Sequence, residues 1–194
     1  MSNYSHFLDR PIFKQIGQAA DHLGLECYVV GGYVRDRLIE RPTKMDLDFV
    51  TVGSGIALAK EVRKGFDKKP KLSVFKSFGT AHMNYQGVDL EFVGARKESY
   101  KRNSRNPIVE DGTLEDDQNR RDFTINAMAI CLNEGRWGEL IDPFNGVDDL
   151  ERKLIKTPLS PDKTFDDDPL RMMRAVRFAA QLDYRIDTGT LKSI

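Results

Sequence analysis

The sequence predicts an α+β fold in which a mixed sheet is flanked by helices. Two observations predict it: hydrophobic segments of strand length alternate with segments whose apolar residues recur at helical spacing, and hydrophobic residues form 40% of the 194 residues. No run approaches the roughly 18 apolar residues that a membrane-spanning helix needs. The chain is expected to form one large domain, or one domain with part of a second.

The first half alternates between helical and strand patterns. Helices are expected over 11–23, 32–39 and 56–66. Gly24 fits the end of the first helix, and Arg41-Pro42 follows the second. Strands are expected over 26–30, 47–52, 72–77, 80–85 and 88–93. The last two strands, joined at Gln86-Gly87, resemble an antiparallel hairpin.

The second half begins with a polar stretch over 97–118, which predicts a long loop of the kind that is usually mobile or functional. A helix over 120–128, short strands over 129–132 and 139–141, and a connecting unit over 146–156 are expected next. Asp168-Pro169 then predicts the start of a strong helix, because proline suits the first helical position.

Charge and cysteine content leave several function classes open. Net charge is zero, and basic residues concentrate in 61–76 and 96–105, which are either phosphate-facing patches or solvated faces. Cys27 and Cys131 match no metal spacing and are expected to be reduced core thiols. The first residues carry no signal-peptide pattern, which favours a cytoplasmic protein.

Two acids spaced i, i+2 are the first candidates for chemistry. Asp46 and Asp48 point to the same face of a strand, while Leu47 and Phe49 point into the core. Two such carboxylates repel unless a cation joins them, and Mg²⁺ prefers a few carboxylates with phosphate oxygens and water. The alternative is a pair of surface acids.

A third acid is expected from the strand over 88–93. Asp89 and Glu91 share one face of it, and either could complete a two-metal site, unless they mark a solvent-facing strand edge.

A glycine turn precedes these acids. Gly31-Gly32 follows a strand and opens a helix, where a phosphate can approach the backbone and the helix N-terminus favours anions. Arg35, one turn into the helix, can add a charge-assisted contact. A simple tight turn is the alternative.

These motifs together resemble a known family. Val30 to Asp36, followed by Asp46 to Val50, is similar to the head of the tRNA nucleotidyltransferases, the class of CCA-adding enzymes shared with bacterial poly(A) polymerases. Stretches that agree in order and spacing are Arg120 to Ala127, Asp142 to Leu150 and Asp167 to Phe178. One departure is Asp167, where the family normally has Glu, which leaves the role of that side chain open.

The resemblance implies a palm-like, mixed and largely antiparallel sheet in a head domain over 1–155, followed by the start of a helical neck over 156–194. It also implies further helical domains that grip tRNA, so the chain is expected to be a truncated piece of a longer protein. No membrane and no protein partner are implied.

The resemblance also assigns roles to matching positions. Asp46 and Asp48 would bind Mg²⁺, with Glu91 as third carboxylate and Asp89 as fallback. The implied nucleotide-binding residues are Gly31, Gly32, Arg35, Arg121, Asp122, Asn126, Asp168, Arg171, Arg174 and Arg177.

The last helix carries a hypothesis for base selection. Asp168 and Arg171 share a face, and Arg174 and Arg177 continue the row; an adjacent apolar stripe can dock on the body, formed by Leu170, Met173 and Val176. Asp168 can accept from an exocyclic amino group, and Arg171 can donate to the ring. Cytosine and adenine present an amino group there, whereas uracil and guanine present a carbonyl. The alternative is that Asp168 only caps the helix and the arginines are solvated.

The resulting hypothesis is template-independent addition of C and A to the 3′ end of tRNA, from CTP and ATP, by two-metal transfer that releases pyrophosphate. The alternatives are a poly(A) polymerase that uses ATP alone and a non-catalytic nucleotide- or RNA-binding module. Phe78 to His82 favours the CCA-adding branch by resemblance only.

Overall fold

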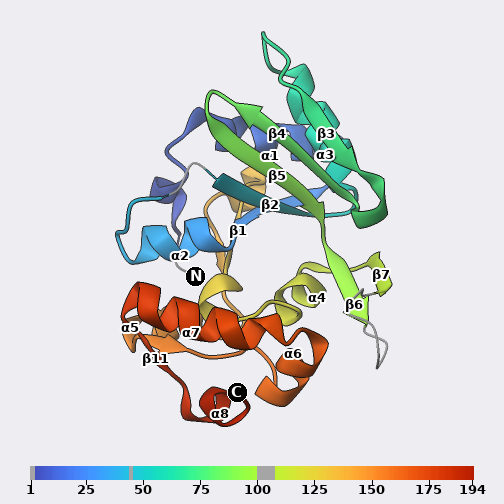
Figure 1. The fold of residues 1–194 in the computed structure, drawn as a ribbon. Coiled ribbons are helices and arrows are strands. Elements are labelled where there is room, and N and C mark those ends of the chain that lie inside the picture. The colour runs from blue at the N-terminus through green and yellow to red at the C-terminus, as the bar shows by residue number, and fades with distance from the viewer. Residues whose placement is uncertain (1–2, 44–45, 100–107) are drawn as a thin grey trace.

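The computed structural model describes residues 3–43, 46–99 and 108–194 (Figure 1). Its centre is a seven-stranded sheet in the order β3-β4-β5-β2-β1-β8-β9. These strands are β1 (Glu26–Val30), β2 (Asp46–Val52), β3 (Leu72–Phe75), β4 (Thr80–Tyr85), β5 (Val88–Gly94), β8 (Ala129–Cys131) and β9 (Leu140–Ile141). Among the described residues of this sheet, β2 and β5 are the only parallel neighbours, so the predicted α+β fold with a mixed, largely antiparallel sheet is confirmed.

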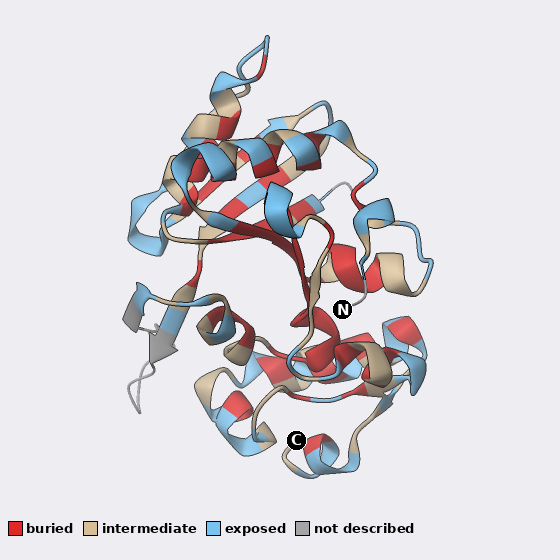
Figure 2. Cartoon of the chain, turned by 180° about the vertical axis from the view of Figure 1, so that it is seen from behind, coloured by how far each residue is buried: buried red, intermediate tan, exposed pale blue. Residues whose placement is uncertain are grey.

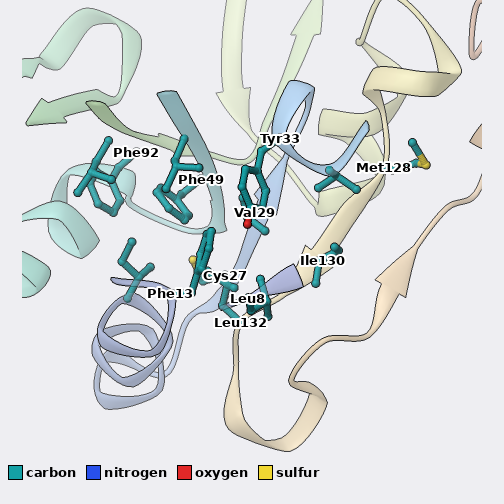
Figure 3. Close-up of a cluster of buried hydrophobic side chains, with 14 of the residues drawn as sticks. Leu8, Phe13, Cys27, Val29, Tyr33, Phe49, Phe92, Met128, Ile130 and Leu132 are labelled. Carbon is teal, nitrogen blue, oxygen red and sulfur yellow. The ribbon is translucent and has the colours of Figure 1, made fainter. Parts of the chain in front are cut away.

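Two helices, α1 (Pro11–Leu23) and α3 (Gly55–Lys64), pack against the sheet, as Figure 1 shows. Pro11 opens α1, and Gly24 ends it with φ of 65°, as the sequence predicts. The core between these elements contains Phe13, Phe49 and Phe92; the rings of Phe49 and Phe92 stack with centroids 5.3 Å apart (Figure 3). This packing fixes the register of β2 and β5.

A second layer lies on the other side of the sheet, below it in Figure 1. Its helices are α4 (Leu114–Asn119), α5 (Gly146–Glu151), α6 (Pro161–Asp167), α7 (Leu170–Leu182) and α8 (Thr188–Lys192). β10 (Leu154–Ile155) pairs in parallel with β11 (Arg185–Ile186) there. The short helix α2 (Gly32–Leu38) lies between the sheet and α7 (Figure 1). In Figure 2 the central strands β1 and β8 are mostly buried, whereas the outward helix faces are exposed.

The predicted loop over 97–118 and helix over 120–128 are wrong in the described residues. β6 (Arg96–Ser99) pairs with β7 (Ile108–Asp111), and α4 follows; residues 100–107 of the predicted loop lie outside the described residues. Thr113 and Asp116 form a capping box that starts α4 earlier than expected. After Asn119 the chain instead forms a single 3-10 turn over Thr124–Asn126.

The last helix also differs from the prediction. Leu170, Met173 and Val176, the stripe expected to dock on the body, are 50% to 70% exposed. The buried residues of α7 are instead Arg171, Ala175, Phe178 and Leu182. The ring of Phe178 meets that of Phe123 edge-on at 5.9 Å, which turns this face inward. Of the arginine row, Arg171 lies on this buried face, whereas Arg177 is exposed.

Cys27 and Cys131 are buried free thiols, as expected. No helix in the described part of the chain is long and apolar enough to span a membrane.

Candidate active site

The carboxylates meet at the parallel pair of strands. β2 and β5 place Asp48 opposite Glu91 and Asp46 opposite Asp89, while Leu47 is fully buried behind them. Asp48 and Glu91 line one cavity together with Arg96 and Arg121. Asp89 instead accepts hydrogen bonds from the side chains of its neighbours Asn84 (2.9 Å) and His82 (3.2 Å).

Electrostatic repulsion in this group is strong. Burial, together with the charges of Asp46 and Glu91, raises the pKa of Asp48 to about 6, although the Arg121 guanidinium opposes the shift. Within residues 3–43, 46–99 and 108–194, no group of three or more His, Cys, Asp or Glu side chains is arranged to hold a metal ion. Asp46 and Asp48 nevertheless line the same cavity and repel each other, so they fit a cation that they would hold jointly with phosphate oxygens and water, as Mg²⁺ prefers.

The glycine turn lies directly beside these acids. Gly31 has φ of 72° and ψ of −134°, which L-residues rarely adopt. A Cβ atom built there would lie 3.6 Å from both Asp48 Oδ2 and Arg121 Nη1. The turn thus exposes bare backbone between a carboxylate and a guanidinium.

Arg35 is buried and held by its neighbours. It donates from Nε to Asp36 (2.8 Å) and from Nη1 to Asn126 Oδ1 (2.8 Å). Its guanidinium lies 5.2 Å from the ring centroid of Phe178 on α7. Arg35 therefore joins the glycine turn to the second layer.

A cavity of about 280 Å³ brings most of the predicted residues together. The predicted residues that line it are Gly31, Gly32, Arg35, Asp46, Asp48, Arg121, Asp122, Asn126, Arg174 and Arg177. Arginine side chains, bare glycine backbone and the carboxylates of Asp46 and Asp48 thus line one cavity. Such a cavity can hold a nucleoside triphosphate with its cation.

Two predicted nucleotide-binding residues do not line this cavity, and neither does Glu91. Arg171 is buried and donates to the backbone carbonyls of Arg120 (2.7 Å) and Thr164 (3.3 Å). Asp168 accepts from the backbone N–H of Leu170 (3.1 Å), just before α7 begins. The row of α7 that does line the cavity starts at Arg174, whose guanidinium pairs with Asp122.

Four lining residues were not predicted: Tyr33, Asp36, Phe178 and Gln181. Phe178 and Gln181 continue the row of Arg174 and Arg177 by helical spacing, so extending that row towards the C-terminus would have found both.

Comparisons with known proteins agree with this geometry. Residues 27–156 match the family model of the poly A polymerase head domain. The chain belongs to this family. The predicted resemblance is therefore confirmed, and the head-domain match contains the glycine turn, the three carboxylates and Arg121.

Named relatives of this head-domain family include tRNA-processing enzymes. The chain is 45% identical over 170 residues to an A-adding tRNA nucleotidyltransferase of Aquifex aeolicus, covering 87% of this chain and 20% of the relative. It is 40% identical over 187 residues to a CCA-adding enzyme of Limosilactobacillus reuteri, covering 95% and 43%. A crystal structure of a tRNA nucleotidyltransferase complexed with a primer tRNA and an incoming ATP analog matches with a TM-score of 0.77 and 41% identity, covering 92% and 48%. The chain thus spans less than half the length of each of these proteins.

Proposed function

We propose that this chain carries the catalytic head of a tRNA nucleotidyltransferase that adds C and A to the 3′ end of tRNA from CTP and ATP without a nucleic-acid template. The observation that carries the proposal is one cavity that joins Asp46, Asp48, a bare glycine turn and Arg121. The identity of about 40% to a CCA-adding enzyme supports the choice of tRNA as substrate. The cytoplasm, where tRNA is matured, is the proposed location.

Each group has a task in this proposal. Asp46 and Asp48 hold Mg²⁺, which when bound lowers the pKa of the attacking hydroxyl and neutralises the leaving pyrophosphate. Glu91 acts as third carboxylate, because it faces Asp48 across the strand pair and shares its cavity. Gly31, Gly32 and Arg35 orient the triphosphate at the start of α2.

The remaining cavity residues grip the rest of the nucleotide. Asp122 and Asn126 are hydrogen-bonded to each other (3.1 Å), so a ribose hydroxyl would meet a preformed acceptor and donor pair. Arg174 and Arg177 add positive charge from α7. Residues 156–194, which include α7, are proposed as the start of the neck.

Base selection is proposed for Asp168 and Arg171. To read a base edge, both side chains must exchange their present backbone hydrogen bonds for contacts with the nucleotide. Asp168→Ala should then blunt the preference for CTP and ATP over UTP and GTP. Unchanged selectivity would remove Asp168 from this role.

A second candidate is an enzyme that adds only A to tRNA, favoured by the 45% identity to the A-adding relative. Two substrates separate the candidates: a tRNA that lacks the whole CCA end and a tRNA that already ends in CC. Incorporation of C from CTP on the first substrate supports CCA addition. Incorporation of A only, and only on the second, supports the A-adding candidate, and A tracts on any RNA support a poly(A) polymerase.

The metal site is tested by substitution in the same assay. Asp46→Ala and Asp48→Ala should abolish incorporation while the thermal unfolding temperature shows that the chain still folds. Glu91→Ala should behave likewise. Asp89→Ala should retain activity, because the Asp89 carboxylate already accepts hydrogen bonds from Asn84 and His82. Loss of activity in Asp89→Ala with full activity in Glu91→Ala would exchange their roles.

A further inference from the structure

Asp117 is a fully buried carboxylate that accepts hydrogen bonds from two arginines, Arg120 and Arg121. Its Oδ2 accepts from Arg121 Nε (3.0 Å) and Nη2 (2.8 Å), and its Oδ1 accepts from Arg120 Nε (3.0 Å) and Nη2. Each guanidinium therefore donates two hydrogen bonds to one oxygen of the carboxylate, and such charge-assisted bonds are stronger than those between neutral groups. Asp117 belongs to α4, the helix that no sequence pattern predicted.

The buried negative charge of Asp117 meets two positive charges. Burial alone would raise the pKa of Asp117, but Arg121 and Arg120 hold it below its usual value. A carboxylate buried in this way stays charged only because its partners are positive and well aligned. Removing its charge would leave two guanidinium groups without their shared partner.

The arrangement leaves one part of Arg121 facing the candidate site. While Nε and Nη2 are held by Asp117, Nη1 donates to the carbonyl of Asn126 (3.3 Å) and lies beside the Gly31 turn. Arg121 lines both cavities that contain Asp48. Asp117 lines neither of these two cavities, so it acts there through the arginines that it holds: Arg121 lines both cavities, and Arg120 lines the one that contains Glu91.

We propose that Asp117 is a positioning residue, which fixes the Arg121 guanidinium with Nη1 aimed at the triphosphate beside Asp48. This inference rests on the proposed function and adds a residue to it. An arginine fixed before the nucleotide arrives needs no reorganisation when negative charge develops on the transferring phosphate. A mobile arginine would lose that advantage, and misplacement of a catalytic group by about 1 Å can cost about a hundredfold in rate.

A double-mutant cycle tests the proposal in the full chain. Asp117→Asn keeps the volume but removes the charge, and we expect kcat/KM for nucleotide incorporation to fall roughly tenfold to a hundredfold. In an Arg121→Ala background, the same Asp117→Asn change should lower kcat/KM less than about threefold, since the group that it positions is gone. Equal losses in both backgrounds, or wild-type activity of Asp117→Asn, would overturn the proposal.

Asp116→Asn serves as the matched control. Asp116 neighbours Asp117 on α4 but is only half-buried, and it accepts from the backbone N–H and hydroxyl of Thr113 at the helix start. Its substitution should lower the unfolding temperature and leave kcat/KM within about twofold, because it weakens the helix cap without releasing Arg121. A loss of activity equal to that of Asp117→Asn would show that α4 stability alone is responsible, and would overturn the proposal.

A readout independent of catalysis separates this inference from the proposed function. The Nε–H resonance of Arg121, assigned by its disappearance in Arg121→Ala, should be protected from solvent exchange in the wild type and lose that protection in Asp117→Asn. Protection that persists in Asp117→Asn would overturn the positioning role whatever the activity. An inactive wild type would instead overturn the proposed function together with the catalytic consequence, and the resonance would still report whether Asp117 holds Arg121.

Discussion

At the scale of single residues, Gly31 and Gly32 have different reasons to be glycine. Gly31 has a backbone conformation that a side chain disfavours, whereas no such strain is found at Gly32, which is the first residue of α2. A Cβ atom at Gly32 would make only an ordinary 3.6 Å contact with Arg35 Nη2. The pair is therefore a strained turn residue followed by a tolerant helical one.

Gly31→Ala should lower the free energy of unfolding by about 1–2 kcal/mol through backbone strain, and should also weaken nucleotide binding because its methyl group faces the site. Gly32→Ala should be neutral or stabilising by up to about 1 kcal/mol, because alanine favours a helix. Urea unfolding and a nucleotide titration measure both effects. Equal unfolding energies for the two variants would contradict the assigned strain.

Asp48 makes the stability of the protein depend on pH and metal. Its folded pKa of about 6 exceeds the unfolded value of 3.8, so the native state binds more protons between these two values. Stability should therefore fall as pH rises from about 4 to about 6 in metal-free buffer, by about 1–3 kcal/mol in total.

Asp48→Asn should remove that decline, and it should raise the metal-free unfolding temperature at pH 7.5. Mg²⁺ should raise the unfolding temperature of the wild type at pH 7.5, since it neutralises the acids, but should raise that of Asp48→Asn much less. Thermal unfolding scans with Mg²⁺ and with a chelator measure this. A Mg²⁺ response that is the same in both proteins would place the ion elsewhere.

At the scale of elements, α7 shows how an amphipathic pattern can be misread. The sequence offers an apolar stripe and a basic row, and ordinary burial preferences favour the apolar stripe as the docking face. The structure buries the face of Ala175, Phe178 and Leu182 instead, which also contains Arg171. Arg171 can be buried because two backbone carbonyls accept hydrogen bonds from its guanidinium group.

Leu182→Ala should therefore lower the free energy of unfolding by about 2 kcal/mol or more, because it opens a cavity in a packed face. Met173→Gln should change it by less than about 0.5 kcal/mol, because Met173 is 70% exposed. Chemical denaturation measures the free energy of unfolding of the two variants. A large decrease in the free energy of unfolding in Met173→Gln would show instead that the apolar stripe is the docking face.

At the scale of the whole molecule, the site lies where the two layers meet. The short stretch from Arg120 to Asp122 contacts α7 twice: the carbonyl of Arg120 accepts from Arg171, and the carboxylate of Asp122 accepts from Arg174. Arg41 adds a third link by donating to the carbonyl of Gln181 (3.1 Å). These contacts hold the basic row of α7 against the glycine turn.

Arg171→Met should weaken this junction most. It keeps most of the side-chain volume but removes the hydrogen bonds to the carbonyls of Arg120 and Thr164. The Thr164 carbonyl still accepts from the N–H of Asp168, so the loss should be about 1–3 kcal/mol. Arg174→Met should cost about 1 kcal/mol or less, because the Arg174 side chain is 42% exposed. Hydrogen exchange of α7 amides should rise more in Arg171→Met than in Arg174→Met, and the reverse order would contradict this junction.

The sequence by itself determined the strands of the seven-stranded sheet, the glycine turn, the paired acids and the family, because these depend on local periodicity and on residue types that few other arrangements require. It left Asp89 and Glu91 open, missed α4, α6 and the β6–β7 pair, and misassigned the buried face of α7. Tertiary structure supplied what was missed, and it favours Glu91 as the proposed third carboxylate, since strand register pairs Asp89 with Asn84 and His82 and places Glu91 beside Asp48. Buried hydrogen-bond partners distant in sequence likewise draw Arg171 inward and fix Arg121 on Asp117. Spacing along a chain predicts which side chains share a face, but only packing decides which face is buried and which charges meet.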